Sequence, residues 1–318
     1  MDGQFSMEYI QLGKTELMAS RVGFGCWAMG GYGWGTVNDG ESIRSIHRAL
    51  ELGINLFDTA DVYGLGHSEE VLRRGLGDDR KRVVIVTKFG LRWDSEARIT
   101  RDISPQRVIE ALEGSLRRLD IDAIPLYFIH GPDDSTPIED TMGALVRCKE
   151  AGKVLHIGCS NLPVETVRRA HAVCPVTGVQ ASYNIVDRTA EQAIIPLCRE
   201  LGISLLTFSS LAQGLLTGKY GPYVTFGEQD IRKRSQYFAG ERAAENMETV
   251  MRVTAVARRL GVTPAQVALR WLLDNPDVVC ALTGVKRPEQ IEENSGATDW
   301  KLDNEAIETL TPAFKARP

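Results

Sequence analysis

The sequence contains no long apolar run. No segment approaches the roughly 20 consecutive apolar residues that a membrane-spanning helix requires. Its N-terminus also lacks the basic and then apolar pattern of a secretory signal. We therefore expect no membrane partner and a cytoplasmic location.

An excess of positive charge is also missing. The 37 Lys and Arg residues are outnumbered by 42 Asp and Glu residues, which gives a net charge of −5. A chain of this charge is a poor match for the anionic surface of a nucleic acid. We expect a small-molecule ligand and no nucleic-acid partner, and a homo-oligomer remains open.

Paired cysteine motifs are absent. None of the cysteines forms a C-x-x-C pair, and they are scattered through apolar surroundings at Cys26, Cys148, Cys159, Cys174, Cys198 and Cys280. This distribution is typical of reduced thiols that pack in the interior, rather than of a metal site or a disulfide framework.

The chain also lacks a Pro- or Ser-rich linker. We therefore predict one domain over residues 1–318, with residues 1–6 as a disordered lead-in. A length of 318 residues suits one α/β barrel.

Short apolar runs alternate with segments of helical period. The runs are apolar throughout, as expected for parallel strands that are covered on both faces. We predict eight strands, at Val22–Trp27, Asn55–Ala60, Val83–Phe89, Pro125–His130, Val154–Cys159, Gly178–Ser182, Ser204–Phe208 and Val278–Leu282.

Several helix ends are legible between these strands. Ser104 followed by Pro105, and Thr263 followed by Pro264, predict helix N-termini. The glycines of Leu52-Gly53-Ile54, Ala151-Gly152-Lys153 and Leu201-Gly202-Ile203 predict helix C-termini just before a strand.

Eight βα units in this length favour a closed (β/α)₈ TIM barrel over an open doubly wound sheet. The open sheet would need a G-x-G-x-x-G turn, and the glycines of Gly30–Gly35 have the wrong spacing for it. Residues 9–12 and 17–20 predict a short β-hairpin of a size to plug the barrel bottom. The longest connection, from about Ala212 to Val250, is predicted to be a functional loop.

Four residues near the predicted strand ends could carry chemistry, namely Asp58, Tyr63, Lys88 and His130. Singly, each has a structural interpretation, such as a helix cap, an ion pair or a buried histidine. In a barrel, however, these positions meet at the catalytic face. Together they suit proton transfer to a carbonyl oxygen.

Tyrosine is a weak acid, with a pKa of about 10. A nearby Lys88 ammonium would lower the pKa of Tyr63, and Asp58 would keep Lys88 charged. His130 would donate a hydrogen bond that orients the substrate carbonyl. These four residues are the predicted catalytic set.

The order of these residues resembles the catalytic tetrad of the aldo-keto reductase superfamily. The resemblance extends from Val22 to about Leu302 and includes the strings FDTADVYG, VTKFG, HGPDD, IGCSN, LAQGLLTGKY and GVKRPEQIEEN. It is strongest to the bacterial branch with short loops, which is similar to potassium-channel β-subunit-like reductases. The resemblance implies reversible hydride transfer between a nicotinamide cofactor and a carbonyl or alcohol, with Tyr63 as the acid.

The resemblance also implies a set of cofactor contacts. Ser160, Asn161 and Gln180 would hold the nicotinamide carboxamide. Lys286 and Arg287 favour NADP(H), with NAD as the alternative, because cations at a helix N-terminus suit a phosphate. The full implied set is Gly25, Trp27, Asp58, Ser160, Asn161, Gln180, Phe208, Ser209, Leu211, Gly214, Lys219, Arg232, Gly284, Lys286, Gln290, Glu293 and Asn294.

Four positions depart from the family pattern: Ser210 and Thr283 stand where prolines are common, and the other two bear directly on the site. Phe208 replaces a tyrosine that stacks on the nicotinamide, and Gly131 replaces a tryptophan after His130, which predicts a wider substrate mouth. Trp27, Tyr63 and His130 are the expected substrate contacts. Three further aromatic residues are available to line the pocket, namely Tyr32, Trp34 and Trp93.

Other functions remain open at this point. The same site run in the oxidative direction would be a sugar or polyol dehydrogenase. A cofactor-binding regulatory protein, resembling potassium-channel β subunits, is a second alternative. A lyase with Lys88 as a Schiff base is a third, although a charged Lys88 opposes it. The physiological carbonyl substrate is not identified by the sequence.

Overall fold

Eight parallel strands close into a barrel in the computed structural model, which describes residues 6–31, 33–240 and 242–311. Their order around the barrel is β10-β11-β12-β3-β4-β5-β8-β9. The strands are β3 (Val22–Gly25), β4 (Leu56–Asp58), β5 (Val84–Phe89), β8 (Ile124–Ile129), β9 (Val154–Ser160), β10 (Gly178–Ser182), β11 (Ser204–Phe208) and β12 (Val278–Gly284).

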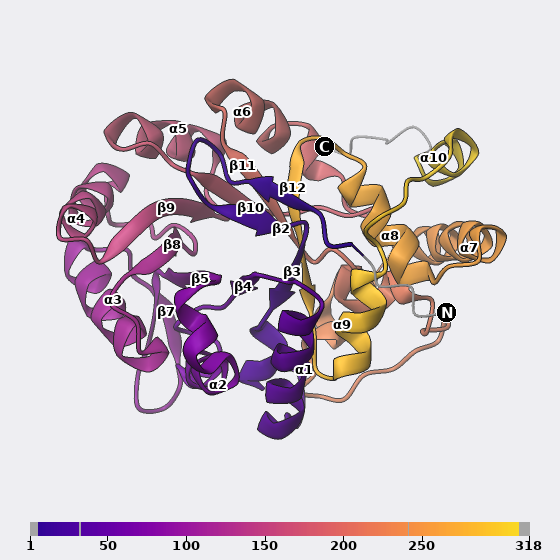
Figure 1. Cartoon of the computed structure of the whole chain (residues 1–318), viewed down its shortest axis with the longest axis horizontal. Coiled ribbons are helices and arrows are strands. Elements are labelled where there is room, and N and C mark those ends of the chain that lie inside the picture. Colours follow the sequence, from indigo (N-terminus) through magenta and orange to yellow (C-terminus); the bar gives the residue numbers. More distant parts are fainter. Residues whose placement is uncertain (1–5, 32, 241, 312–318) are drawn as a thin grey trace.

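Helices surround this barrel (Figure 1). They are α1 (Asp39–Glu51), α2 (His67–Leu76), α3 (Pro105–Leu119), α4 (Ile138–Glu150), α5 (Val164–Val173), α6 (Ile194–Leu201), α7 (Arg242–Leu260), α8 (Pro264–Leu273), α9 (Pro288–Ser295) and α10 (Asn304–Leu310). Short 3₁₀ turns lie at Trp27–Gly30, Gly77–Lys81, Thr189–Glu191, Ala212–Thr217 and Ile231–Arg234.

The predicted (β/α)₈ fold is thus confirmed, and each of the eight predicted strands corresponds to a barrel strand. Their ends differ by a few residues. The first strand ends at Gly25, so Trp27 begins a 3₁₀ turn instead of ending a strand. The last strand continues to Gly284, two residues beyond its predicted end.

The predicted helix ends are also confirmed. Ser104 Oγ accepts a hydrogen bond from Arg107 N at 3.3 Å, and Pro105 is the first residue of α3. Thr263 and Gln266 form a capping box at the start of α8. The predicted C-terminal glycines adopt positive φ, as a left-handed helix end requires (Gly53, Gly152 and Gly202).

The N-terminal hairpin consists of β1 (Tyr9–Gln11) and β2 (Met18–Ser20), which pair antiparallel. Leu12 and Ala19 are fully buried, and they pack in one cluster with apolar side chains from the barrel strands, among them Leu56 and Phe128. The hairpin therefore closes one end of the barrel, as predicted.

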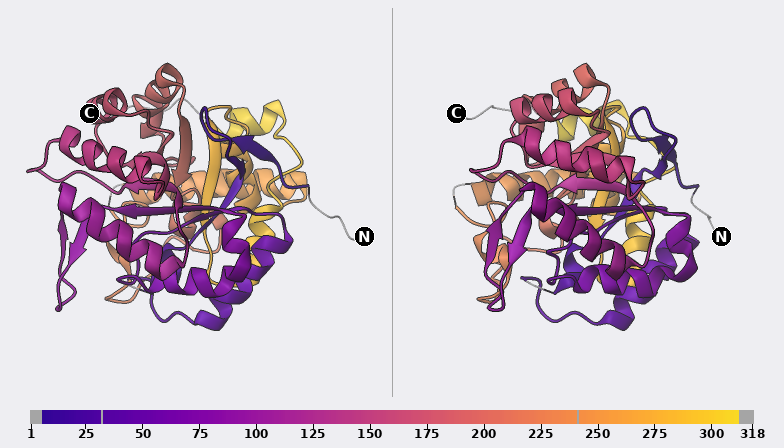
Figure 2. Two further views of the ribbon diagram at one scale, coloured as in Figure 1. Left: turned by 60° about the vertical axis from the view of Figure 1, so that its left-hand side comes forward. Right: turned by 90° about the vertical axis from the view of Figure 1, so that its left-hand side faces the viewer.

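A second hairpin was not foreseen. Strands β6 (Leu91–Trp93) and β7 (Ile99–Arg101) pair antiparallel within the connection between β5 and α3. Figure 2 shows this hairpin and the β1–β2 hairpin on opposite sides of the barrel in both views. The second hairpin therefore overhangs the end where the strands terminate.

The connection from Ala212 to Val250 is not a continuous loop, because α7 begins at Arg242 and two 3₁₀ turns precede it. A disordered lead-in is predicted for residues 1–6, and residues 1–5 of it lie outside the described residues. Tyr32, an expected pocket residue, also lies outside them.

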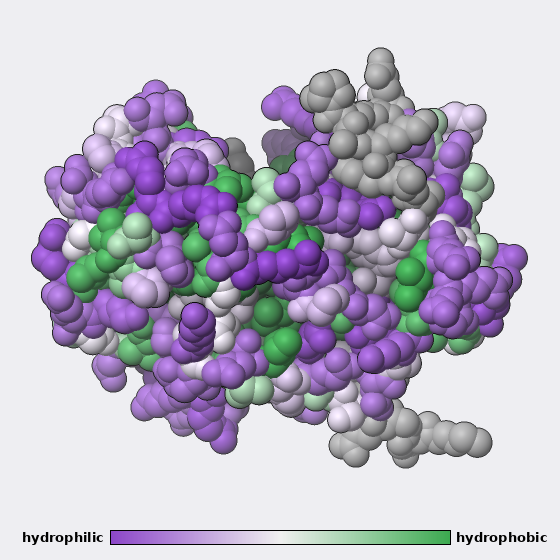
Figure 3. All heavy atoms as spheres, turned by 90° about the horizontal axis from the view of Figure 1, so that it is seen from above, coloured by the Kyte–Doolittle hydropathy of each residue, from purple (hydrophilic) through white to green (hydrophobic). Residues whose placement is uncertain are grey.

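The outer surface is mainly polar. Figure 3 shows a largely hydrophilic face with smaller hydrophobic patches between the polar side chains. Among the described residues, no helix is both long enough and apolar enough to span a bilayer.

Candidate active site

The four predicted catalytic residues meet at one end of the barrel. Asp58 is the last residue of β4, Lys88 lies near the end of β5, and His130 directly follows β8. Tyr63 lies in the loop between β4 and α2. This is the end of a barrel at which catalytic groups gather.

Lys88 is the centre of this group. Its ammonium donates to Asp58 Oδ1 and Oδ2, both at 2.8 Å, and to Thr59 O at 2.7 Å. It also donates to Tyr63 Oη at a longer distance of 3.5 Å. Lys88 is only 1% exposed, so these contacts replace the water that it would otherwise bind.

Lys88 keeps its charge in this environment. Burial lowers the pKa of Lys88, but Asp58 and then Tyr63 raise it. Their combined effect is larger than that of burial, so the pKa lies above its ordinary value. A protonated lysine cannot attack a carbonyl, which argues against the Schiff-base alternative.

The pKa of Tyr63 departs from the sequence expectation. Burial raises the pKa of Tyr63, and the charge of Lys88, which opposes this effect, does not outweigh it. The prediction of a lowered pKa is therefore wrong, because it considered the nearby charge without the desolvation of a buried phenol. Tyr63 thus remains protonated near neutral pH and is able to donate.

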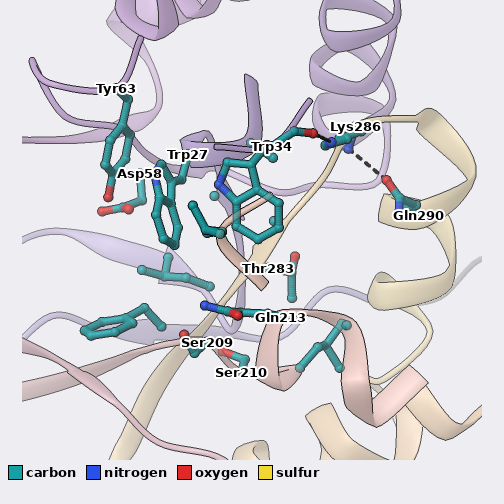
Figure 4. Close-up of a pocket in the computed structure, with 18 of the residues that line it drawn as sticks. Trp27, Trp34, Asp58, Tyr63, Ser209, Ser210, Gln213, Thr283, Lys286 and Gln290 are labelled. Atoms are coloured by element: carbon teal, nitrogen blue, oxygen red, sulfur yellow. Dashed lines mark hydrogen bonds between the residues drawn. The ribbon is translucent and has the colours of Figure 1, made fainter. Parts of the chain in front are cut away.

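Close backbone packing positions Tyr63. A Cβ on Gly30 would lie 2.6 Å from Gly64 N, and one on Gly64 would lie 2.4 Å from Gly30 O. Only glycines allow this approach. The contact brings the turn that carries Trp27 against the Tyr63 loop, and the two rings stack with centroids 6.1 Å apart (Figure 4).

His130 meets Tyr63 edge to face, with ring centroids 5.7 Å apart. Burial first, then the charges of Lys88 and Arg101, lower the pKa of His130 to about 3. The imidazole is therefore neutral at physiological pH. A neutral imidazole carries one N–H, which is able to donate to a carbonyl oxygen.

These side chains border a cavity of about 910 Å³. A cavity of this volume falls within the range of small-molecule and cofactor sites. All the predicted catalytic, cofactor and substrate residues line it, namely Gly25, Trp27, Asp58, Tyr63, Lys88, His130, Ser160, Asn161, Gln180, Phe208, Ser209, Leu211, Gly214, Lys219, Arg232, Gly284, Lys286, Gln290, Glu293 and Asn294.

The three residues expected to hold a carboxamide adjoin the catalytic group. Gln180 Nε2 donates to Asp58 Oδ1 at 2.5 Å. Asn161 Nδ2 donates to His130 O and to Ser160 Oγ, both at 3.0 Å. Asn161 also has a positive φ of 54°, a conformation that is uncommon outside glycine.

The segment after β11 has features of a binding loop. Ser209, Ala212 and Gln213 have positive φ values, at 53°, 47° and 56°. Such strain is retained mainly at functional sites. Gln213 Oε1 and Trp34 Nε1 are buried without a hydrogen-bond partner, and both residues line the cavity. Unpaired buried polar atoms of this kind fit a site for a polar cofactor.

Positive charge gathers at the far end of the cavity. Lys219, Arg232 and Lys286 all line it, and Lys286 Nζ donates to Trp34 O (Figure 4). Burial lowers the pKa of Lys286, and the charges of Arg232 and Lys219 lower it further, although Asp230 opposes them. A bound phosphate would relieve this repulsion.

Arg101 lies next to Gly131, the position for which a wider substrate mouth is predicted. A Cβ at Gly131 would lie 2.6 Å from Arg101 Nη1, so this guanidinium takes up the space next to the glycine. The sequence could not indicate this, because Arg101 reaches Gly131 only through the β6–β7 hairpin.

Other lining residues were also missed. Leu91 and Ile99 come from the unforeseen hairpin, and Gln213 comes from the loop after β11. The functional loop predicted from about Ala212 to Val250 was the available signal for Gln213. Trp27 and Trp34 line the cavity, whereas Trp93 is not among its lining residues and instead lies against Arg107.

The cysteines take no part in the site. All six are free thiols, and burial raises the pKa of Cys26 and of Cys159, which suits packing rather than reactivity. Within the described part of the chain, no cluster of His, Cys, Asp or Glu side chains could hold a metal ion.

Comparison with known proteins decides the family. The profile of the Aldo/keto reductase family matches residues 21–313. The chain belongs to the aldo-keto reductase family. It is 37% identical to the aldo-keto reductase YhdN of Bacillus subtilis over 302 residues, which cover 94% of this chain and 91% of that protein. The tetrad geometry described above thus belongs to an oxidoreductase fold.

Two other relatives carry more specific names. The chain is 34% identical to an NADP(+) aldo-keto reductase of Schizosaccharomyces pombe, over 92% of this chain and 87% of that one. It also superposes on the glycerol dehydrogenase of Gluconobacter oxydans with a TM-score of 0.86 and 34% identity, covering 95% and 93% of the two chains. A holo form of an aldo-keto reductase from Bacillus halodurans gives a TM-score of 0.80 at 25% identity, with 96% of each chain covered.

Proposed function

We propose that this protein reduces aldehydes, ketones or keto sugars to alcohols with NADPH, as a single-domain cytoplasmic enzyme. The observation that carries the proposal is the buried contact of Lys88 with Asp58 and Tyr63, beside His130. This arrangement provides a neutral phenol and a neutral imidazole at one point of the cavity wall.

Each catalytic side chain has a defined task. His130 donates a hydrogen bond to the substrate carbonyl oxygen and fixes its direction. Tyr63 gives its proton to the same oxygen as negative charge develops there, and Lys88 stabilises the resulting phenolate. Asp58 keeps Lys88 charged, and solvent later returns a proton to Tyr63.

A nicotinamide cofactor would supply the hydride equivalent when bound. Ser160, Asn161 and Gln180 would hold its carboxamide, because their hydroxyl and amide groups both donate and accept hydrogen bonds. Phe208 would stack on the ring. The other predicted cofactor residues line the remainder of the same cavity.

NADPH is favoured over NADH by the charge at the far end of the cavity. Lys286 and Arg287 stand at the start of α9, where a helix N-terminus adds its own positive potential. The NADP(+) name of one relative supports the same choice. NADH remains the alternative that the experiment distinguishes.

A second candidate is oxidation of a polyol with NADP⁺. The superposition on a glycerol dehydrogenase favours it. The same residues would act in reverse, with Tyr63 as the base. Measuring turnover in both directions with one carbonyl–alcohol pair decides which direction is faster.

Binding and turnover test the proposal together. Titration with NADPH and with NADH should quench the fluorescence of Trp27 and Trp34, which line the cavity, and NADPH should saturate at the lower concentration. Tyr63→Phe should retain NADPH binding but lose most carbonyl reduction, because the phenyl ring has no proton to donate. Activity close to wild type in this variant would refute the role of Tyr63, and absence of binding by either cofactor would refute the proposed function.

A further inference from the structure

The β6–β7 hairpin presents one face to the substrate end of the cavity. Leu91 and Ile99 line the cavity, and Leu91 is the register partner of Arg101. Residues opposite one another in an antiparallel pair share a face, as do alternate residues of one strand. Arg101 therefore lies on the same face of the hairpin as Leu91 and Ile99.

The guanidinium of Arg101 lies beside the catalytic histidine. Its Nη1 donates to Pro132 O at 3.1 Å, and the same atom would be 2.6 Å from a Cβ on Gly131. Both neighbours directly follow His130 in the chain. The contribution of Arg101 to the lowered pKa of His130 is a second sign that its charge acts at the catalytic end.

Arg101 has donors to spare. It is exposed, and among the described residues no carboxylate lies within ion-pair distance of it. The nearby acids are already engaged: Asp102 accepts from Arg92 and Ser104 N, and Asp133 accepts from Ile103 N and Thr136 N. A guanidinium has five N–H groups, and one hydrogen bond leaves most of them available.

The opposite face of the hairpin provides a contrast. Arg92, which neighbours Leu91, forms ion pairs with Asp102 and Glu110. The hairpin thus has a neutralised cation on one face. On the other face Arg101 pairs with the cavity-lining Leu91 but is not itself among the lining residues, and it has no carboxylate partner among the described residues. Glu41 and Glu293, which also line the cavity, come from α1 and α9, which follow β3 and β12, whereas this hairpin follows β5.

We propose that Arg101 is a specificity-determining residue that binds a carboxylate carried by the substrate. This inference rests on the proposed function. The substrate class is an aldehyde or ketone whose carboxylate is separated from the carbonyl by an apolar spacer, because Trp27, Leu91 and Ile99 provide apolar walls near the tetrad. The planar guanidinium matches a carboxylate through two parallel hydrogen bonds.

A matched pair of aldehydes tests this assignment. The kcat/KM values for 4-carboxybenzaldehyde and for its neutral methyl ester should be compared in the wild type and in Arg101→Met. The ratio of kcat/KM for the acid to kcat/KM for the ester should fall about tenfold to hundredfold in Arg101→Met. The fall should come mainly from a higher KM for the acid, as expected for loss of one charge-assisted pair. Arg101→Lys should retain part of the preference, since it keeps the charge but loses the fork.

Arg117→Met is the control for net charge. Arg117 is exposed on α3, and its substitution removes the same charge from the surface. Its ratio of acid to ester should equal that of the wild type. An unchanged ratio in Arg101→Met, or an equal fall in Arg117→Met, would overturn the assignment.

A binding measurement separates this inference from the proposed function. Calorimetric titration of the NADP⁺-loaded protein with 4-(hydroxymethyl)benzoate should give a Kd at least about tenfold higher in Arg101→Met than in the wild type. Equal Kd values, or no binding to the wild type, would overturn the role of Arg101 even if the methyl ester is reduced. Failure to reduce either aldehyde would instead count against the proposed function, and the titration would still decide the role of Arg101.

Discussion

Lys88 retains a positive charge in a place where burial alone would remove it. The two short hydrogen bonds from Lys88 to Asp58 raise the pKa of Lys88 against the opposing effect of desolvation, so the ion pair stays charged. The same burial keeps Tyr63 protonated and His130 neutral. At the scale of single residues, the site therefore holds one ion pair next to two neutral proton donors.

This combination predicts a flat pH profile for reduction. His130, with its pKa lowered to about 3, stays neutral above that pH, and Tyr63, with its pKa raised above the ordinary value of about 10, stays protonated. With saturating NADPH, kcat/KM for a neutral aldehyde should be constant from pH 6 to 9 and fall only at more alkaline pH. A transition centred between pH 6 and 8 would contradict this assignment of protonation states.

Lys286 offers a test of cofactor choice at the same scale. Lys286→Met removes a cation from the group formed with Lys219 and Arg232, so it should weaken NADPH binding about tenfold and NADH binding less. Fluorescence titration measures both affinities. Lys81→Met, on the exposed turn after α2, is the matched control. An equal loss for both cofactors would place Lys286 at a phosphate that they share.

At the scale of elements, one buried arginine joins three parts of the site. Arg107, near the start of α3, donates to Asp61 in the Tyr63 loop and to Leu91 O of β6 at 2.7 Å, and it lies over the ring of Trp93. Asp61 is also close to Glu69, Arg118 and the Tyr127 hydroxyl. Arg107 thus holds the Tyr63 loop and the β6–β7 hairpin together.

This network predicts a stability loss that grows with pH. Burial raises the pKa of Asp61 to about 7 against the pull of Arg107, so Arg107→Met should raise it further. The folded variant would then bind a proton that the unfolded chain does not, and its stability would fall as pH rises through this range. Urea unfolding should show a loss of about 3–5 kcal/mol at pH 8 and a smaller one at pH 6.

Arg107→Lys, which keeps the charge, should show a smaller dependence on pH than Arg107→Met. The same loss at pH 6 and pH 8 in Arg107→Met would show that Asp61 does not titrate in this interval.

At the scale of the whole molecule, stability and chemistry lie at opposite ends of the barrel. The β1–β2 hairpin closes one end with Leu12, and the β6–β7 hairpin lies at the other (Figure 2). The tetrad lies at this second end, where the barrel strands terminate. Barrels of this type commonly separate the two in this way. Changes at the closed end should therefore affect folding more than catalysis.

Leu12→Ala tests this separation. Leu12 is fully buried, so the cavity left by its truncation should cost about 2–5 kcal/mol in urea unfolding. The folded fraction should keep the kcat/KM of the wild type. Leu155→Ala, at a side chain that is 40% exposed, should cost less than about 0.5 kcal/mol. A large fall in kcat/KM of folded Leu12→Ala would show that the two ends are coupled.

The sequence by itself determined the barrel and brought the four predicted catalytic residues to one end of it. Apolar runs, the Ser104 and Thr263 caps and the glycines at helix ends are local signals, and each was confirmed in the structure. Asp58, Lys88 and His130 lie at or next to strand ends, and parallel strands in a barrel bring these ends together. Their proximity therefore follows from the order of the elements alone.

Only the tertiary structure decided how these groups behave. The raised pKa of Tyr63 depends on how fully the surrounding side chains exclude water, which no spacing reports. The short β6 and β7 strands form where their hairpin packs over the barrel mouth, and this packing carries Arg101 into the space beside Gly131. Desolvation and long-range contact depend on the folded arrangement of distant segments, so they could not be read from neighbouring residues.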